Sequence, residues 1–289
     1  MSEGEGAAPG ADDAAAEAAV DDDALLVLTA MLLTPARFPG VLGDDYPAAC
    51  AALALAPYEE GYGLVLGQDG QGARWTVVVE DASQVAAAIA AWDCGLEHDL
   101  SPDERSVVCA LPGWPMELAV SAPGVPEPHD PETDAEGPAP LAPPDPEAWG
   151  PPQRRLGADE IAAQWPVWRG QLDDAQVVRP DAGPEGDAGR EPADDASAAV
   201  RHPGVRRALS EAAAYTTAPP PPGRIRSSYA SAEARTLRVD GPGWSMVART
   251  DDIALFLLDE EPGTVIPVGR GAALPGLLMA LDGLAVRPA

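Results

Sequence analysis

The sequence predicts an α+β fold in which antiparallel strands form one or more sheets with helices packed on one face. Three observations carry this prediction. Apolar runs of strand length alternate with Ala/Leu-rich runs of helix length. Turns containing Gly or Pro separate neighbouring runs. Acidic, Pro-rich stretches divide these runs into two groups, so we expect two ordered lobes joined by long acidic disordered linkers.

The first lobe is expected over residues 24–120. Its opening run, 24–33, is apolar along almost its whole length, and periodicity alone leaves helix and strand both open. The other elements expected here are, in order, a helix at 46–56, a hairpin of strands at 62–66 and 74–80, a helix at 83–93, and strands at 105–111 and 116–120.

The second lobe is expected over residues 200–289, and a short Trp-containing segment, 154–172, precedes it. Its expected elements are, in order, a basic amphipathic helix at 204–215, strands at 236–239, 244–249, 253–258 and 264–268, and a helix at 274–284. Each lobe holds a strand that is apolar on both faces, which indicates burial on both sides. The sequence leaves open whether the two lobes share one sheet.

The net charge of −29 comes largely from a tail, 1–23, and two linkers, 121–153 and 173–199. Together these stretches hold 23 of the 47 acidic residues and only two of the 18 basic ones. Pro-rich acidic chain buries too little apolar surface to offset the entropy cost of ordering it. We therefore expect all three stretches to be disordered.

Every basic residue of the chain is Arg, and the chain contains neither Lys nor Asn. A Walker A loop needs Lys on the phosphates, pyridoxal phosphate needs a Schiff-base Lys, and a protein kinase needs both its Lys and its catalytic-loop Asn. We therefore expect no cofactor and no nucleotide bound through a Walker A loop. The bias toward Ala, Gly, Pro and Arg also indicates a GC-rich genome.

The length of the longest apolar run and the number of cysteines predict that the protein is cytoplasmic. The apolar run at 24–33 is about half the length that spans a bilayer, and it follows three Asp residues instead of the basic start of a secretory signal. The odd number of cysteines, Cys50, Cys94 and Cys109, argues against a disulfide framework. We therefore expect a cytoplasmic protein with no membrane partner.

Candidate catalytic groups are present without a diagnostic pattern. Cys94, His98 and Cys109 lack the C-x2-C pair of structural zinc sites, and reduced cysteines in apolar runs are ordinary core residues, so we expect no metal site. Ser245 with His98 and an acid, or carboxylates at the strand ends, would serve a hydrolase. No catalytic residue is assigned from the sequence.

An Arg-rich segment provides the first binding candidates. Between residues 200 and 239 seven Arg stand against two Glu, directly after the acidic stretch 173–199. One interpretation is a basic surface that this stretch masks until an anionic partner displaces it, and the other is charge balance of an amphipathic helix. The negative net charge and the absence of Lys disfavour nucleic acid. The residues predicted to bind are Arg201, Arg206, Arg207, Arg224 and Arg226.

Trp165 and Trp168 provide the second candidates, because they lie in the short segment between two acidic linkers. Trp is a frequent anchor of protein interfaces, which favours a docking motif for a protein partner. The alternative is that both side chains pack on the core and tie the two lobes together.

These features favour a non-enzymatic adaptor, chaperone or regulatory protein of the bacterial cytoplasm that acts through protein–protein interaction. The predicted arrangement resembles, in architecture alone and with no shared motif, two-lobed α+β chaperones and adaptors of bacterial secretion systems. Two alternatives stay open. One is a hydrolase that uses carboxylates or a Ser/His pair, and the other is a regulator whose Arg-rich segment binds an anionic partner.

Overall fold

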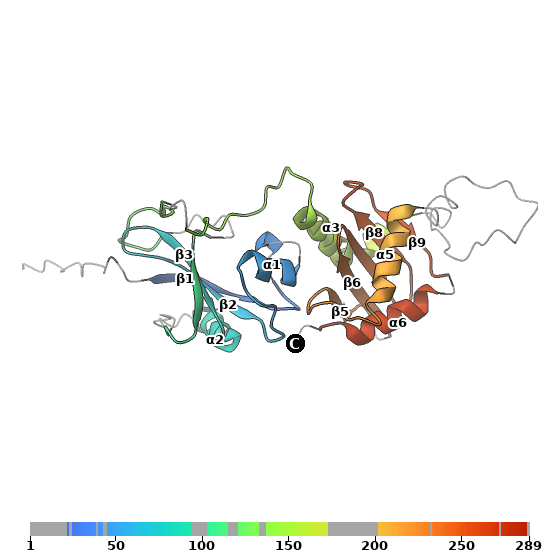
Figure 1. Ribbon diagram of the computed structural model, residues 1–289, viewed down its shortest axis with the longest axis horizontal. Coiled ribbons are helices and arrows are strands. Elements are labelled where there is room, and N and C mark those ends of the chain that lie inside the picture. The colour runs from blue at the N-terminus through green and yellow to red at the C-terminus, as the bar shows by residue number, and fades with distance from the viewer. Residues whose placement is uncertain are drawn as a thin grey trace, which may run out of the picture.

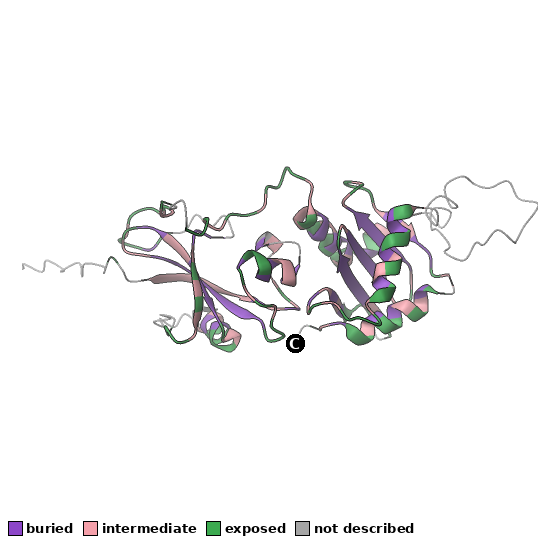
Figure 2. Ribbon diagram, viewed as in Figure 1, coloured by how far each residue is buried: buried purple, intermediate pink, exposed green. Residues whose placement is uncertain are grey.

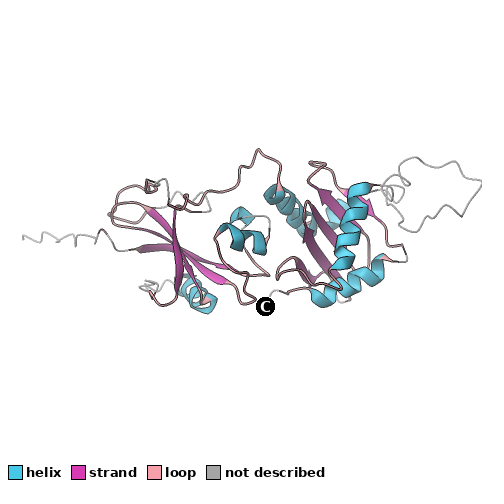
Figure 3. Ribbon diagram, in the orientation of Figure 1, coloured by secondary structure: helices cyan, strands magenta, loops and turns pink. Residues whose placement is uncertain are grey.

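The fold is α+β, and it contains two antiparallel sheets and six α-helices among the residues that the computed structural model describes (Figures 1 and 3). Within those residues, no helix is long and apolar enough to cross a membrane. The described residues are 22, 25–38, 40–42, 45–93, 103–114, 121–132, 137–172, 202–231, 233–271 and 273–287. The expected tail 1–23, apart from Asp22, the expected strand 116–120 and the expected linker 173–199 lie outside them.

The first sheet has four strands in the order β1-β2-β3-β4, and every neighbouring pair is antiparallel. Their bounds are β1 (Leu26–Leu33), β2 (Tyr62–Gln68), β3 (Arg74–Val79) and β4 (Val107–Pro112). The apolar run that the sequence left open is therefore a strand. Its side chains reach both faces of the sheet, because Leu33 joins one apolar cluster and Leu32 packs against another.

One helix covers each face of this sheet. Helix α1 (Tyr46–Ala52) packs on the face of Leu64 and Trp114, and it follows a short 3₁₀ turn, η1 (Gly40–Leu42). Helix α2 (Ala82–Asp93) packs on the opposite face, where Val85 lies against the strand valines. The sequence predicted both helices. It did not predict that they would lie on opposite faces.

The second sheet has five antiparallel strands in the order β5-β6-β7-β8-β9. They are β5 (Ile225–Tyr229), β6 (Arg235–Gly241), β7 (Trp244–Arg249), β8 (Ala254–Leu258) and β9 (Ile266–Val268). The two sheets are separate. We call the part that contains β1 to β4 the first unit and the part that contains β5 to β9 the second unit, and the two units do not share one sheet.

Helices cover both faces of the second sheet, whereas the sequence predicted helices on one face. Helices α5 (Pro203–Ala214) and α6 (Leu274–Leu284) share a buried core with one face. Helices α3 (Pro151–Ala163) and α4 (Trp165–Gly170) pack on the other. The reason is the composition of β7 and β8, which are apolar at successive positions and therefore need cover on both sides.

Part of the stretch 121–153 lies along the first sheet, whereas its composition predicted a disordered linker. The side-chain amide of Gln68 accepts a hydrogen bond from the backbone N–H of Ala122 at 2.7 Å and donates one to the carbonyl of Pro126 at 2.8 Å. The backbone of His129 pairs with the β2–β3 turn. Backbone groups and one buried amide thus hold a segment that has few apolar side chains to bury.

Candidate functional site

Charged side chains gather where the two units meet. Five Arg and four Asp form a cluster that we call the Arg–Asp network. Arg154 and Asp45 have no solvent-exposed surface, and Arg155 and Asp240 have almost none. The network consists of Arg154, Arg155, Arg224, Arg226, Arg238, Asp45, Asp159, Asp240 and Asp259.

Asp240, on β6, is the centre of this network and is 1 % exposed. It pairs with Arg155 of α3 and lies 3.6 Å from the guanidinium of Arg226. Burial alone would raise the pKa of the Asp240 carboxyl. The neighbouring guanidinium groups of Arg155, Arg238 and Arg226 outweigh burial and hold this pKa below its usual range. Asp240 is therefore a carboxylate at neutral pH.

Ser245, the candidate nucleophile, belongs to the same network. Its hydroxyl donates to Asp240 at 2.6 Å and accepts from the Nε of Arg154 at 3.1 Å. Arg154 also pairs with Asp259 at 2.9 Å. Ser245 is fully buried, so this geometry ties β7 to α3 and does not present the hydroxyl to a substrate. His98, its proposed partner, lies outside the described residues.

The network extends across the junction of the two units through Asp45. One carboxylate oxygen caps α1 by accepting the N–H of Ala48 at 2.8 Å, and the other lies 2.6 Å from Arg224 of the second unit. Burial is the main influence and raises the pKa of the Asp45 carboxyl, against the opposing effect of Arg224. Phe38 adds a second contact, since Arg155 and Arg226 stack over its ring at 4.5 and 5.2 Å.

The predicted Arg residues therefore separate into groups. Arg224 and Arg226 are partly buried in the network, and burial, helped by Arg155, lowers the pKa of Arg226 to about 10. Arg206 and Arg207 are exposed on α5, where Arg207 pairs with Glu260 at 2.6 Å. Arg201 and the acidic stretch 173–199 lie outside the described residues, so masking and the binding of an anionic partner stay predictions.

Trp165 and Trp168 lie on the face of the second sheet that α3 and α4 cover. Trp165 is 4 % exposed and belongs to a core cluster with Val247 and Leu255, and Trp168 packs against that cluster. A partner would reach Trp165 only if α4 moved away from the sheet.

The described cysteines and His202 occupy positions in which they contribute to the structure. Cys50 is buried in α1 and Cys109 is half-buried in β4, and burial raises the pKa of both thiols. His202 caps α5 by accepting the N–H of Val205 and lies 2.5 Å from Glu261. No group of three or more potential metal ligands occurs within the described parts of the chain.

The outer edge of β1 has no partner strand among the described residues, where only β2 pairs with β1. Seven of its eight residues are half-buried, and none is charged (Figure 2). Isolated outer strands with unpaired backbone groups are templates for a further strand, and proteins usually protect them with charges, Pro or a covering segment.

The other three sheet edges are each covered or interrupted at some point, although residues 107–111 of β4 carry neither charge nor Pro and pair only with β3 among the described strands. Strand β4 ends in Pro112, whose carbonyl accepts the N–H of Leu141. The backbone of Val286 pairs with β5 through hydrogen bonds of 3.0 Å to the residues on either side of Arg226. Strand β9 has three residues, one of which is Pro267. Only β1 among these four edges is long, uncharged and free of Pro.

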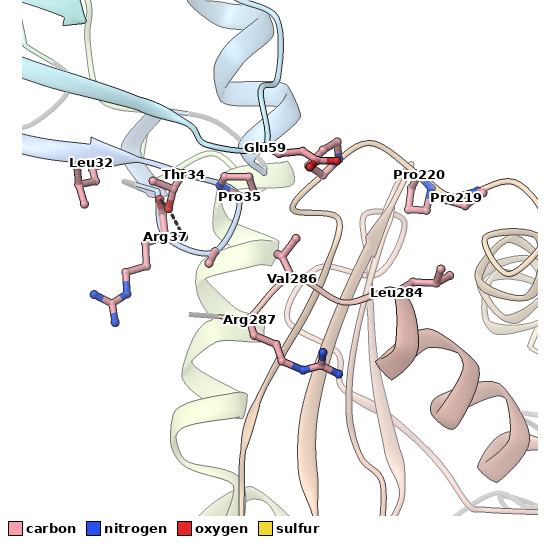
Figure 4. Close-up of a pocket in the computed structure, with 12 residues that line it drawn as sticks. Leu32, Thr34, Pro35, Arg37, Glu59, Pro219, Pro220, Leu284, Val286 and Arg287 are labelled. Atoms are coloured by element: carbon pink, nitrogen blue, oxygen red, sulfur yellow. Dashed lines mark hydrogen bonds between the residues drawn. The ribbon is translucent and has the colours of Figure 1, made fainter. Parts of the chain in front are cut away.

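A cleft of about 720 Å³ opens between the two units at the carboxyl end of β1. Its charged lining groups are Arg37, Glu59 and Arg287. Arg37 and Arg287 both extend away from Glu59, and their side chains diverge from each other (Figure 4). Its apolar lining includes Leu32, Pro35, Pro219, Pro220, Leu284 and Val286.

Comparison of the chain with protein-family models, with curated proteins and with solved structures finds no significant match.

Proposed function

We propose that this protein is a non-enzymatic cytoplasmic adaptor that binds an extended segment of a partner protein by adding it as a strand to the outer edge of β1. The single observation that carries the proposal is that, among the described residues, the outer edge of β1 is uncharged, free of Pro and paired only with β2, whereas β4 ends in Pro112, β5 pairs with Val286 and β9 has three residues. Backbone hydrogen bonds supply affinity in this mode of recognition, and alternate side chains supply specificity.

Burial along β1 supports this reading. β1 is an outer strand, so β2 covers one of its edges. A strand added at the other edge would give β1 a second neighbour. Leu28 and Met31 pack only partly into one core, and Val27, Ala30 and Leu32 only partly into the other. An added strand would shield these side chains on both faces of the sheet, which favours binding by removing apolar surface from water.

Charge defines the chemistry of the segment. Residues 24–150, which include β1, hold 20 acidic residues and three Arg. An acidic segment would be repelled, whereas a neutral or basic one would be attracted before contact. The partner segment is therefore extended, rich in β-branched or aromatic residues, and neutral or basic along its length.

The test is selection of a displayed library of random twelve-residue peptides on the full chain, followed by affinity measurement for an enriched peptide by fluorescence anisotropy. The decisive variants are Ala30→Pro and Met31→Pro, which stand at neighbouring positions in regular register with β2. Successive N–H groups of a strand point to opposite sides, so one substitution removes an outward N–H and the other an N–H bonded to β2.

We expect the outward substitution to weaken peptide binding at least tenfold while the melting temperature stays unchanged. The inward one should lower the free energy of unfolding by about 1–3 kcal/mol, because a carbonyl of β2 loses its partner. Val108→Pro, on the opposite edge strand, is the matched control and should keep full affinity. Binding that survives both β1 substitutions would contradict the proposal. A β1-dependent dimer of the unliganded chain would also contradict it, because the edge would then bind a second copy.

A further inference from the structure

Resting on the proposed function, we infer that the bound segment runs parallel to β1 and ends in the cleft, where its free C-terminal carboxylate pairs with Arg37. The partner would thus be recognised by its carboxyl terminus. The inference starts from continuity, because Leu32 belongs both to β1 and to the cleft lining. A segment laid along β1 therefore leads directly into the cleft.

The turn after β1 fixes the position of Arg37. Thr34 and Arg37 exchange two backbone hydrogen bonds, of 2.6 and 3.1 Å. The hydroxyl of Thr34 adds two more at 3.0 Å, accepting from the N–H of Arg37 and donating to its carbonyl. Four hydrogen bonds thus hold the backbone of Arg37 four residues beyond the last residue of β1. Its guanidinium makes none of them.

Charge sets the direction of the segment. A strand parallel to β1 brings its C-terminal carboxylate to the cleft, whereas an antiparallel one brings its N-terminal ammonium. The cleft lining holds two guanidinium groups, those of Arg37 and Arg287, against the carboxylate of Glu59. Arg287 is partly neutralised by Asp282 at 3.4 Å, which leaves Arg37 as the stronger partner for an anion. A carboxylate is therefore favoured and an ammonium is not.

Apolar lining completes the site. Leu32 and Pro35 of the first unit and Pro220, Leu284 and Val286 of the second all line the cleft. Leu284 keeps 39 % of its surface exposed, although it lies in a helix whose other face is buried. An apolar side chain on the last residue of the segment would cover this surface. The inferred ligand is therefore an extended C-terminal peptide with an apolar final residue.

The experiment uses the enriched peptide from the library, resynthesised with a free carboxylate and with a C-terminal amide, and the full chain with Arg37→Ser. Arg105→Ser is the matched control, because Arg105 is an exposed Arg of the same unit away from the cleft. We expect amidation and Arg37→Ser each to weaken binding about tenfold or more, and Arg105→Ser to have no effect. Amidation should weaken binding to the Arg37→Ser protein no further, because the two changes remove the same contact.

The outcomes separate this inference from the proposed function. Binding that requires the β1 edge and ignores both amidation and Arg37→Ser overturns the C-terminal inference and leaves strand addition intact. Binding that depends on the carboxylate and Arg37 but tolerates both Pro substitutions in β1 overturns strand addition. Additive losses from amidation and Arg37→Ser also overturn the inference, because the carboxylate then has a different partner.

Discussion

The two units use charge in opposite ways. Residues 24–150 hold 20 acidic residues and three Arg, whereas residues 151–172 and 200–289 hold 11 acidic residues and 13 Arg. In the second unit the charges meet inside the fold, as Asp240 does with Arg155. In the first, most of the carboxylates that the structure describes lie at the surface, and no such network links them to one another. The second unit is thus internally neutralised and closed, and the first keeps a strong negative field around an open strand.

This difference supports the proposal that the first unit, and not the second, binds a partner. Four members of the Arg–Asp network have almost no exposed surface, so a ligand in solution cannot reach these groups in the folded protein. An open edge in an acidic field selects a partner by backbone pairing and by charge. In the proposed function the second unit would serve as the scaffold, because its contacts with Asp45 and Phe38 attach it to the first unit. Gly223 permits this close approach, because a Cβ there would lie 2.9 Å from that of Tyr46.

The largest effect is expected from breaking the centre of the network. Asp240→Asn leaves Arg155, Arg226 and Arg238 without their shared carboxylate, which is costly for buried cations. We expect the free energy of unfolding to fall by about 3–5 kcal/mol in urea titrations followed by Trp fluorescence. Asp251→Asn removes an exposed partner of Arg249 in the same sheet and should change stability far less. Equal losses in the two variants would refute the contrast between buried and exposed pairs.

The pH dependence of stability should distinguish Asp240 from Asp45. The pKa of Asp240 is lowered in the fold, so its contribution is fully present at neutral pH and is lost as the pH falls below about 4, the unfolded value. The pKa of Asp45 is raised by burial, so protonation in acid relieves a cost instead. Urea midpoints from neutral to acidic pH should therefore fall less steeply in Asp240→Asn than in the parent chain, and more steeply in Asp45→Asn. The opposite order would show that other carboxyls dominate.

The smallest expected change in stability distinguishes the two roles of Asp45, which caps α1 and pairs with Arg224. Asn caps a helix about as well as Asp but cannot pair as an anion with Arg224, whereas Ala does neither. Asp45→Ala should therefore be less stable than Asp45→Asn by about 1 kcal/mol, which is the value of the cap alone. Calorimetric scans of both variants beside the parent chain measure the difference. Identical transitions would mean that the cap contributes nothing.

The sequence predicted most elements because their signals are local. The hairpin of β2 and β3, helix α2, helix α5 and strands β6 to β8 all follow from apolar period and turn residues. Strand β5 was missed, because its sequence IRSSY is mostly polar. Helix α3 was also missed as a helix, since its buried face includes Arg154 and Arg155, which read as exposed residues until Asp240 and Asp259 meet them.

The candidate site was less accessible to sequence reasoning for a related reason. The density of Arg in the sequence pointed to Arg224 and Arg226, but it did not reveal their partners. Asp45, the partner of Arg224, lies far from it in the sequence, and Asp240, the partner of Arg226, lies on the next strand. The open edge of β1 depends on which strands pair, and no single run of residues carries that information. One signal was present, since 26–33 is a strand-length apolar run without the charges or Pro that protect outer strands.

Helices α3 and α4 belong to the second unit, although residues 173–199 separate them from the rest of it along the chain. Buried ion pairs and Trp165 attach them to the sheet, so their attachment does not depend on the peptide bonds of that stretch. The protein is therefore suited to being divided there into two separately expressed pieces. Their reassembly would report on the network in a living cell, in the manner of a split reporter.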